Sequence, residues 1–279
     1  MKDKILKIYI YIIKRLSKSP LTKVDFIHKN LNSYIRRKLK PEFIFTDVGK
    51  IFLDRDDSLR LSIHGGWDDF ETEVIKKIVK EGNTVVDVGA HIGIYTLLLS
   101  KLVGEKGKVY SFEPDESNFS LLEKNIKENN IKNVILIKKA VSDIDGEVNF
   151  YASKVNSGMG SLYKKKRISE EECKCESVRL DGYFKNIKID FIKIDTEGAD
   201  PFVIIGGRKV LKNRSIKIIT ECLPSHLEEN GFGYENYLKL IVDLGFKLYN
   251  IDEKNKKLTE VNNSKILKDR FRKNFLCVR

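Results

Sequence analysis

Four polar side chains in the second half of the sequence have the chemistry of proton acceptors. Asp195 and Glu197 stand two residues apart directly after one apolar run, and Glu221 ends another. His226 lies five residues beyond Glu221. A carboxylate or an imidazole can take the proton of a reacting hydroxyl, or hold that hydroxyl in place. On an extended backbone Asp195 and Glu197 would share one face, so we predict that these four residues carry the catalytic step.

Each of these residues also has a simpler interpretation. Asp195 and Glu197 could cap the next helix, although the Asp-Pro pair at 200–201 already suits that place, with its aspartate as N-cap. His226 could be an ordinary surface histidine. Hard divalent cations bind carboxylates, so Asp195, Glu197 and Glu221 could hold a metal ion. We expect hydrogen bonds to an acceptor instead, and we predict no metal.

A second group of residues lies earlier, where a glycine loop joins a β-branched run to an apolar helix. The strand expected at Thr84–Val88 contains Asp87, and Gly89, His91 and Gly93 follow it. Small residues before a helix N-terminus let the backbone approach a nucleotide-type ligand. The spacing D-x-G-x-x-x-G is looser than the dinucleotide fingerprint G-x-G-x-x-G. The alternative is a tight strand–helix turn without a ligand.

Glu113 strengthens the nucleotide interpretation. It ends the strand expected at Lys108–Phe112 and lies twenty residues beyond Gly93. A carboxylate at the tip of the second strand can accept hydrogen bonds from both ribose hydroxyls of a nucleoside. The alternative is that Glu113 caps the following helix, for which Pro114 is also suitable. The two features in register predict an adenosyl cofactor.

The elements around these residues decide how they meet. Apolar runs alternate with amphipathic helices, which is typical of an α/β fold with a mainly parallel sheet. Ligands of such sheets bind at the carboxyl ends of the strands. Further strands are expected at Val134–Lys138, Glu176–Val178, Phe191–Ile194, Ile216–Thr220, Phe246–Tyr249 and Asn274–Val278. Helices are expected at about 69–80, after Gly93, and at Ser117–Asn129, Leu180–Phe184 and Tyr234–Leu244.

The chain is expected to divide into a helical N-terminal extension, residues 1–41, and one domain, residues 42–279. The domain opens with a small β-lead at 42–64, which comprises strands at Phe43–Phe45, Lys50–Leu53 and Leu59–Ile63. In the extension, 5–16 is an apolar segment with basic flanks, and 24–39 has helical spacing. Lys7 interrupts the first segment, which is too short to span a bilayer. It could pack on the domain or another subunit, or lie in a membrane interface.

Composition sets further bounds. The 279 residues are 41% hydrophobic and 33% charged, so the chain can bury a core. The net charge of +12 comes from lysines spread among glutamates, which favours a solvated surface over a nucleic-acid site. Four cysteines without a C-x-x-C pair argue against structural zinc and indicate reduced thiols in a cytoplasmic protein. A redox pair of Cys173 and Cys175 is the alternative.

One long polar segment, Ser153–Ser169, interrupts the regular pattern. Loops of this length in compact domains are often lids or binding loops. The alternative is a surface excursion without a role.

From about Leu59 to Asn250 the chain resembles the FkbM family of methyltransferases. The segments that match are Gly66-Trp67 with the acidic helix start after it, VVDVGAHIGIYT, SFEP, AVSD with Asp145-Gly146, VRLDGYF and DFIKIDTEGAD. Their order and spacing are more specific than any one segment. The resemblance implies a Rossmann-like class I methyltransferase fold, with a mainly parallel seven-stranded sheet and helices on both faces. It also implies S-adenosylmethionine as cofactor and methylation mostly on oxygen.

The resemblance and the residues together give a predicted site. The cofactor contacts are expected from Asp87, Gly89, His91, Gly93, Glu113, Ala140 and Asp195. Lys139 precedes Ala140 where many related methyltransferases carry an acid that reaches adenine, so adenine should rely on backbone and apolar contacts here. His91 replaces a common asparagine in a place whose role is led by the backbone.

The leading hypothesis is methylation of a sugar hydroxyl in a glycan or small natural product. The substrate class comes from the resemblance alone. One alternative is a protein or RNA methyltransferase, supported only by the net charge; we expect no nucleic-acid partner, because no basic-aromatic module is present. The other alternative is a non-enzymatic scaffold that binds the cofactor and docks on a membrane through residues 5–16. The expected location is cytoplasmic, with a peripheral membrane contact through that segment.

Overall fold

The computed structural model describes residues 40–64, 69–166, 169–261 and 273–279. The two helices expected at 5–16 and 24–39 lie outside the described residues, as does the Gly66-Trp67 pair. Among the described helices, none is long and apolar enough to cross a membrane.

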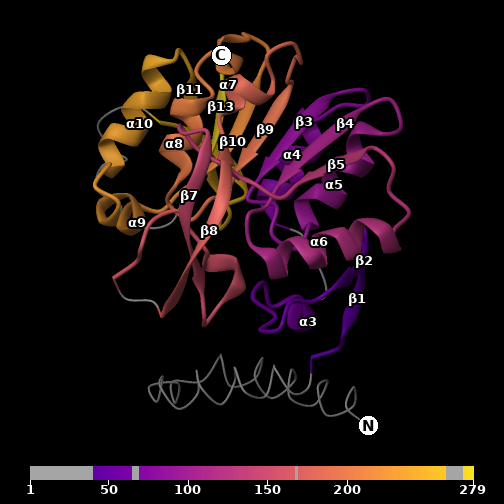
Figure 1. The fold of residues 1–279 in the computed structure, drawn as a ribbon. Coiled ribbons are helices and arrows are strands. Elements are labelled where there is room, and N and C mark those ends of the chain that lie inside the picture. Colours follow the sequence, from indigo (N-terminus) through magenta and orange to yellow (C-terminus); the bar gives the residue numbers. More distant parts are fainter. Residues whose placement is uncertain (1–39, 65–68, 167–168, 262–272) are drawn as a thin grey trace, which may run out of the picture.

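A main sheet of eight strands forms the centre of the molecule (Figure 1). Its strand order is β12-β11-β13-β10-β9-β3-β4-β5, and the strands from β10 to β5 run parallel to one another. β13 lies antiparallel between β10 and β11. The strands are β3 Thr84–Val88, β4 Lys108–Phe112, β5 Val134–Ile137, β9 Phe191–Ile194, β10 Lys217–Cys222, β11 Lys247–Asp252, β12 Lys257–Glu260 and β13 Lys273–Val278. This arrangement confirms the predicted class I methyltransferase-like α/β fold.

The main sheet has eight strands, one more than the expected seven. β12 pairs antiparallel with β11 at the edge of the sheet, and all four of its residues are exposed. A strand with no buried face has no apolar alternation, so the sequence carries no signal for it.

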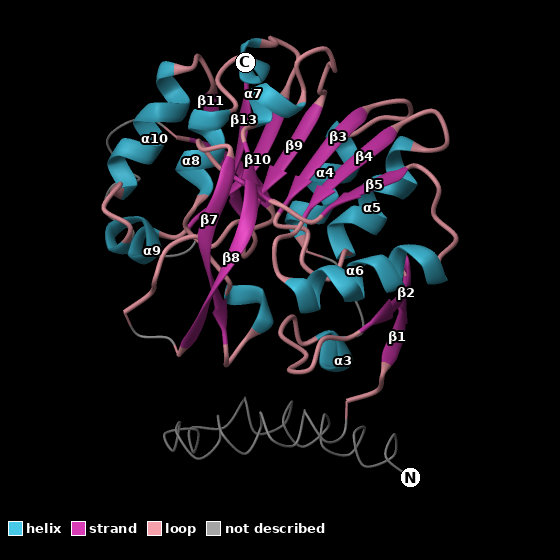
Figure 2. Cartoon of the chain, in the orientation of Figure 1, coloured by secondary structure: helices cyan, strands magenta, loops and turns pink. Residues whose placement is uncertain are grey.

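Helices cover both faces of the sheet (Figure 2). α7, α8 and α10 pack through one apolar cluster, which includes Val86, Ile192 and Tyr237, and α4 and α5 pack through another, which includes Val85 and Phe191. Successive strand residues therefore face opposite layers, as expected for a sheet buried on both sides. The helices are α4 Phe70–Ile78, α5 Ile94–Val103, α6 Glu116–Glu128, α7 Leu180–Tyr183, α8 Asp200–Gly206, α9 Pro224–Glu229 and α10 Tyr234–Asp243, with 3₁₀ turns η2 Ser157–Met159 and η3 Val210–Lys212.

The β-lead contains two of its three predicted strands. β1 Phe43–Thr46 and β2 Gly49–Phe52 form an antiparallel hairpin. The side chain of Asn125 in α6 accepts a hydrogen bond from Phe52 N at 2.7 Å and holds the hairpin against the domain.

The prediction of a third strand in the β-lead, at Leu59–Ile63, is wrong. The structure has a short helix there, α3 Leu61–His64, after Arg60 with a φ of 54°. Asp57 accepts hydrogen bonds from Ser62 N at 3.4 Å and from Ser62 Oγ at 2.5 Å. Such local side-chain bonds compete with strand pairing, and here they outweigh the apolar pattern.

A second, three-stranded sheet stands beside the main one. Its order is β6-β8-β7, with β6 Ala140–Val141, β7 Gly146–Ser153 and β8 Glu170–Val178. β7 and β8 form a long hairpin that carries the segment 154–166 at its tip (Figure 1). β8 begins at Glu170, earlier than the predicted start at Glu176. Its first residues are polar and mostly exposed, so they have no apolar pattern from which a strand could be predicted.

Candidate functional site

One cavity of about 610 Å³ runs along the carboxyl ends of the strands in the described part of the chain. Its wall extends from Glu113 after β4, past Gly89 and Asp195, to Asn274 in β13 and Glu253 after β11. This is the place where open α/β sheets bind ligands. The volume is ample for a ligand of cofactor size and a second molecule beside it.

The glycine loop closes against the neighbouring strand. Gly89 N and Ala90 N both donate to Phe112 O at 3.0 Å. Gly89 has a φ of 82°, and a Cβ there would overlap the carbonyl oxygen of Asp195. Glycine is therefore required because the backbones of two loops meet at this point.

Glu113 lies at the centre of this loop region. Its side chain is buried, Oε2 accepts from His91 N at 2.9 Å, and Oε1 accepts from Asp115 N at 3.0 Å. Burial raises the pKa of Glu113 to about 7, although the two backbone bonds lower it. The helix cap is Asp115, which accepts from Ser117 N and Asn118 N, so Glu113 does not cap α6. Because Glu113 lines the cavity, its carboxylate can also accept a hydrogen bond from a ligand.

His91 links three segments of the site. Its backbone has a φ of 51° and supports Glu113, as described above. Its Nε2 lies 3.0 Å from Ser157 Oγ and 3.5 Å from Ser58 Oγ. Burial lowers the pKa of the imidazole, which favours the neutral ring. The ring thus connects the β-lead, the glycine loop and the segment 154–166.

Two other predicted cofactor residues lie apart from the cavity. The buried carboxylate of Asp87 accepts from Thr96 Oγ1 at 2.7 Å and ties β3 to α5; burial raises its pKa. Gly93, with a φ of 95°, is the N-cap of α5. Neither residue lines the cavity. Their role toward a ligand would be to hold the loop.

The cavity wall near Glu113 fits an adenosyl nucleoside. Phe112, Ala140 and Val141 give apolar contact for a base, and the Glu113 carboxylate can accept from ribose hydroxyls. Lys139 also lines the wall, and its Nζ is 2.6 Å from Glu176. Asn118 Oδ1 is buried there without a hydrogen-bond partner among the described residues, so a ligand donor can satisfy it.

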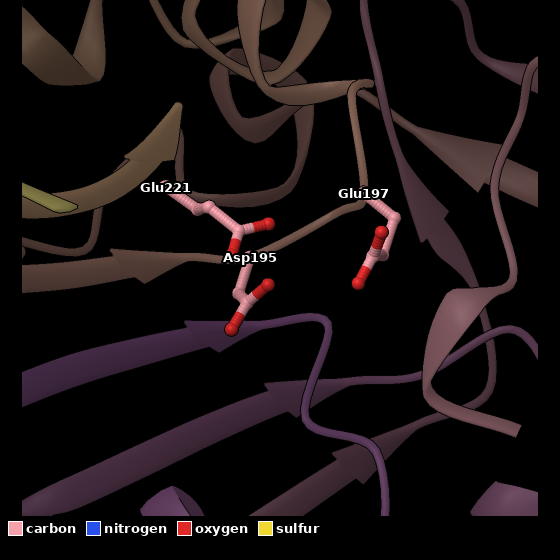
Figure 3. A group of neighbouring side chains, drawn as sticks. All are labelled: Asp195, Glu197 and Glu221. Carbon is pink, nitrogen blue, oxygen red and sulfur yellow. The ribbon is translucent and has the colours of Figure 1, made fainter. Parts of the chain in front are cut away.

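The carboxylates of Asp195, Glu197 and Glu221 lie close together beside the next part of the wall (Figure 3), which Asp195 and Glu197 line and the buried Glu221 does not. One oxygen of each lies within 4.8 Å of the others. The extended backbone predicted for 195–197 is wrong: Glu197 has a φ of 53°. The left-handed turn brings Glu197 round toward Asp195 from the loop, whereas Glu221 comes from the end of β10.

Lys193 balances part of this charge. It is buried, its Nζ is 2.8 Å from Asp195 Oδ2 and lies 4.1 Å from the centre of the Tyr95 ring. Burial lowers the pKa of Lys193, but the carboxylates of Asp195 and Glu71 raise it more, so the net shift is upward. Lys193 was not among the predicted site residues; the signal for it was a lysine inside the apolar run FIKI.

Glu197 has two partners of its own. Its Oε2 lies 3.3 Å from Lys165 Nζ and 3.3 Å from His226 Nδ1. Its backbone carbonyl accepts from Ser161 Oγ at 3.1 Å. Glu197 and His226, predicted separately as candidate bases, are thus brought together, and the His226 ring lines the cavity. Lys165 was missed, because nothing in the run of lysines at 164–166 distinguishes it.

Gly198 and Asp200 set the turn that carries Glu197. Gly198 has a φ of 102°, and a Cβ there would lie 2.8 Å from the Cβ of His226. Asp200 Oδ2 accepts from Gly198 N at 3.1 Å. α8 begins at Asp200 with Ala199 at the N-cap, so the predicted Asp200 cap is one residue too late.

Three carboxyls in and around this site share a strongly raised pKa. In each the main cause is burial, which disfavours the charged form, and each reaches about 7. These three raised carboxyls are Glu71, Glu113 and Asp200.

The carboxylate trio has oxygen ligands of the kind that hard cations prefer. However, Asp195 already has the ammonium of Lys193 beside it, and Glu197 has that of Lys165. A metal ion would have to compete with both ammonium groups, so the prediction of no metal stays.

Comparisons with known proteins identify the family. Residues 87–248, more than half of the chain, match the model of the methyltransferase FkbM domain. Over 119 residues the chain is 32% identical to a protein of Saccharolobus solfataricus described as "Probable cobalt-precorrin-6B C(15)-methyltransferase (decarboxylating)", covering 42% of this chain and 57% of that protein. Over 81 residues it is 30% identical to the ribosomal protein L11 methyltransferase of Thermotoga maritima, covering 29% of this chain and 30% of that protein. The chain thus spans between about a third and somewhat over half of these curated relatives.

Among solved structures, two methyltransferases are similar to this chain. The methyltransferase FkbM of Methylobacillus flagellatus matches with a TM-score of 0.45 and 14% identity, over 90% of this chain and 59% of that one. An S-adenosylmethionine-dependent O-methyltransferase of Thermotoga maritima matches with a TM-score of 0.43 and 17% identity, over 89% and 81%. The family match spans both the glycine loop and the carboxylate group of the cavity. The chain belongs to the FkbM methyltransferase family.

Proposed function

We propose that the enzyme methylates a hydroxyl group of a neutral, hydroxyl-rich acceptor, such as a sugar in a glycan or a small natural product. S-adenosylmethionine supplies the methyl group, which is electrophilic because it is bonded to a sulfonium. The chain's own residues must bind the acceptor, align its oxygen and remove its proton.

The lining of the cavity away from Glu113 carries this proposal. Asp69, Asp195, Glu197 and Glu253 contribute carboxylates to it, and Asn274 contributes an amide. Carboxylates accept hydrogen bonds from hydroxyls, and the amide can both donate and accept. Four carboxylates against the two lining cations, Arg60 and Lys193, leave an excess of negative groups. This excess disfavours a phosphate-bearing acceptor such as RNA, because like charges repel in a partly buried site.

The pair of Glu197 and His226 is suited to proton removal. His226 Nδ1 lies 3.3 Å from the Glu197 carboxylate but is not aligned for a hydrogen bond among the described residues. A small rotation of the ring would let the carboxylate orient it and stabilise it once it gains a proton. We assign proton acceptance to His226 and orientation of the ring to Glu197. Asp195, held by Lys193, is placed to accept a hydrogen bond from the acceptor or from the cofactor's methionine end.

The segment 154–166 closes the cavity on the side away from the sheet. Ser157 to Leu162 line the wall, and Asn118 Nδ2 donates to Ser157 O at 3.0 Å. These contacts support the role of a lid that excludes water and orients the acceptor.

Transfer of tritium-labelled methyl groups tests the proposal. Acceptors would be neutral oligosaccharides, the same oligosaccharides carrying phosphate, total RNA and unmodified protein. We expect labelling of the neutral oligosaccharides, with loss of it in His226→Gln. Labelling of RNA or protein alone would contradict the proposal and favour the alternative suggested by the net charge.

A further inference from the structure

Lys165 is buried although it stands in a run of three lysines. Its side chain is 3% exposed, whereas Lys164 and Lys166 are exposed. Removing an ammonium group from water is costly unless good partners replace the water. The burial of this one lysine therefore depends on specific contacts.

Those contacts lead directly to the proposed proton-accepting pair. Lys165 Nζ donates to Met159 O at 2.7 Å and to Glu197 Oε2 at 3.3 Å. The same Oε2 is the atom 3.3 Å from His226 Nδ1. An ammonium from the lid, a carboxylate and an imidazole thus lie in a row.

The lid segment around Lys165 is held by hydrogen bonds at two points. Lys165 N donates to Glu170 Oε2 at 3.0 Å, at the start of β8. Ser161 Oγ donates to the backbone carbonyl of Glu197. The lid therefore holds Glu197 both at its main chain and at its carboxylate.

Charge makes the second of these contacts necessary. Glu197 shares a space of 4.8 Å with the carboxylates of Asp195 and Glu221, and like charges at that distance repel. Asp195 has Lys193 as a counter-charge, whereas Glu197 receives its ammonium from the lid.

We propose that Lys165 is a positioning residue for methyl transfer, which holds the Glu197 carboxylate against His226 and so makes the closed lid a condition of proton removal. The proposal rests on the proposed function, since it assumes that Glu197 and His226 act in the transfer. Lys165 itself touches neither the acceptor nor the cofactor in this role.

The first test measures the His226 ring and needs no acceptor. Protein labelled with ¹⁵N-histidine is loaded with S-adenosylhomocysteine, and His226→Gln assigns the ring signals. Lys165→Met should move or broaden the His226 signals, and Lys165→Arg, which keeps the charge, should restore them. Lys166→Met is the matched control and should leave them unchanged. Unmoved His226 signals in folded Lys165→Met would overturn the proposal.

Glu197→Gln keeps the proposal testable if Lys165→Met does not fold. It weakens the same contact from the other side, so backbone amides of 157–166 should exchange with solvent faster. Unchanged exchange in that segment would refute the coupling.

The second test is transfer to a neutral oligosaccharide that the unaltered enzyme labels. Lys165→Met should lower kcat by roughly 10- to 100-fold, the usual effect of losing a group that orients a reacting one, with KM for the cofactor unchanged. Lys165→Arg should recover most of kcat. A loss shared equally by Lys166→Met, or a change confined to KM, would contradict a positioning role. Failure of the unaltered enzyme to label any acceptor would count against the proposed function. The NMR signals of the His226 ring would still test whether Lys165 positions Glu197 and His226.

Discussion

Cofactor affinity should depend on pH through Glu113. Its carboxyl has a pKa of about 7 because it is buried, and ribose hydroxyls need its ionised form as an acceptor. With that pKa, about a tenth of the molecules carry the ionised form at pH 6 and about nine tenths at pH 8. Apparent affinity falls in proportion to the competent fraction, so binding should weaken about tenfold from pH 8 to pH 6.

The substitution Glu113→Gln separates this effect from other titrations in the cavity. Hydrogen bonds to a charged acceptor contribute about 1.5 to 3 kcal/mol, so binding at pH 8 should weaken about 10- to 100-fold. The remaining affinity should lose most of its pH dependence. Glu116→Gln, an exposed neighbour paired with Lys138, serves as the control and should behave as the unaltered protein does.

Isothermal titration calorimetry with S-adenosylhomocysteine at pH 6, 7 and 8 measures both quantities. Repeating the titration in two buffers of different ionisation enthalpy also counts protons, and proton release should accompany binding at pH 6. Flat affinity across this range, or full affinity in Glu113→Gln, would show that Glu113 does not hold the ribose.

Four further changes have expected outcomes. Glu197→Gln should lower single-turnover transfer by roughly 100- to 10,000-fold while cofactor affinity by calorimetry stays within a factor of a few, and normal transfer would remove Glu197 from the proton step. Gly89→Ala should lower the free energy of unfolding in urea by about 1 to 3 kcal/mol more than Gly146→Ala, because both have positive φ but only the first meets a neighbouring backbone; equal losses would refute the close approach. The three raised carboxyls bind protons more tightly in the folded state, so the melting temperature should fall as pH rises from about 5 to 8, and a rise would contradict their burial. EDTA should leave transfer unchanged, whereas activity lost in EDTA and restored by magnesium would make the carboxylate trio a metal site.

The cofactor half of the site was largely predictable from local sequence. Between Thr84 and Glu113 the two strands, the glycine loop and the acidic residue after the second strand are close in the chain, so their spacing specifies their geometry. The edge position of Glu113 followed from the parallel sheet, and the structure places it there. The backbone N–H groups that donate to Glu113 could not be predicted, because His91 N reaches Glu113 only through a left-handed turn.

The acceptor half was predictable only as a set of residue types. Glu197 and His226 were identified as candidates, but their pairing depends on the turn at Gly198 and on where α9 begins. Lys165 gave no signal, since a lysine run is normally solvated and its burial depends on a partner 32 residues away. Contacts between segments that are distant in the chain leave no periodic pattern to recognise.

The hairpin tip between β7 and β8 gives this architecture a route to new specificity over evolutionary time. Residues that fit the nucleoside lie between Gly89 and Val141, whereas the lid belongs to a separate turn at the end of a two-stranded ribbon. Loop tips tolerate insertions and deletions far better than the strands that carry them. A duplicated gene could therefore change the length or composition of 154–166 and recognise another hydroxyl, while the donor half stays as it is. Such changes in the lid would have to keep one contact, because the ammonium group of Lys165 must still reach Glu197.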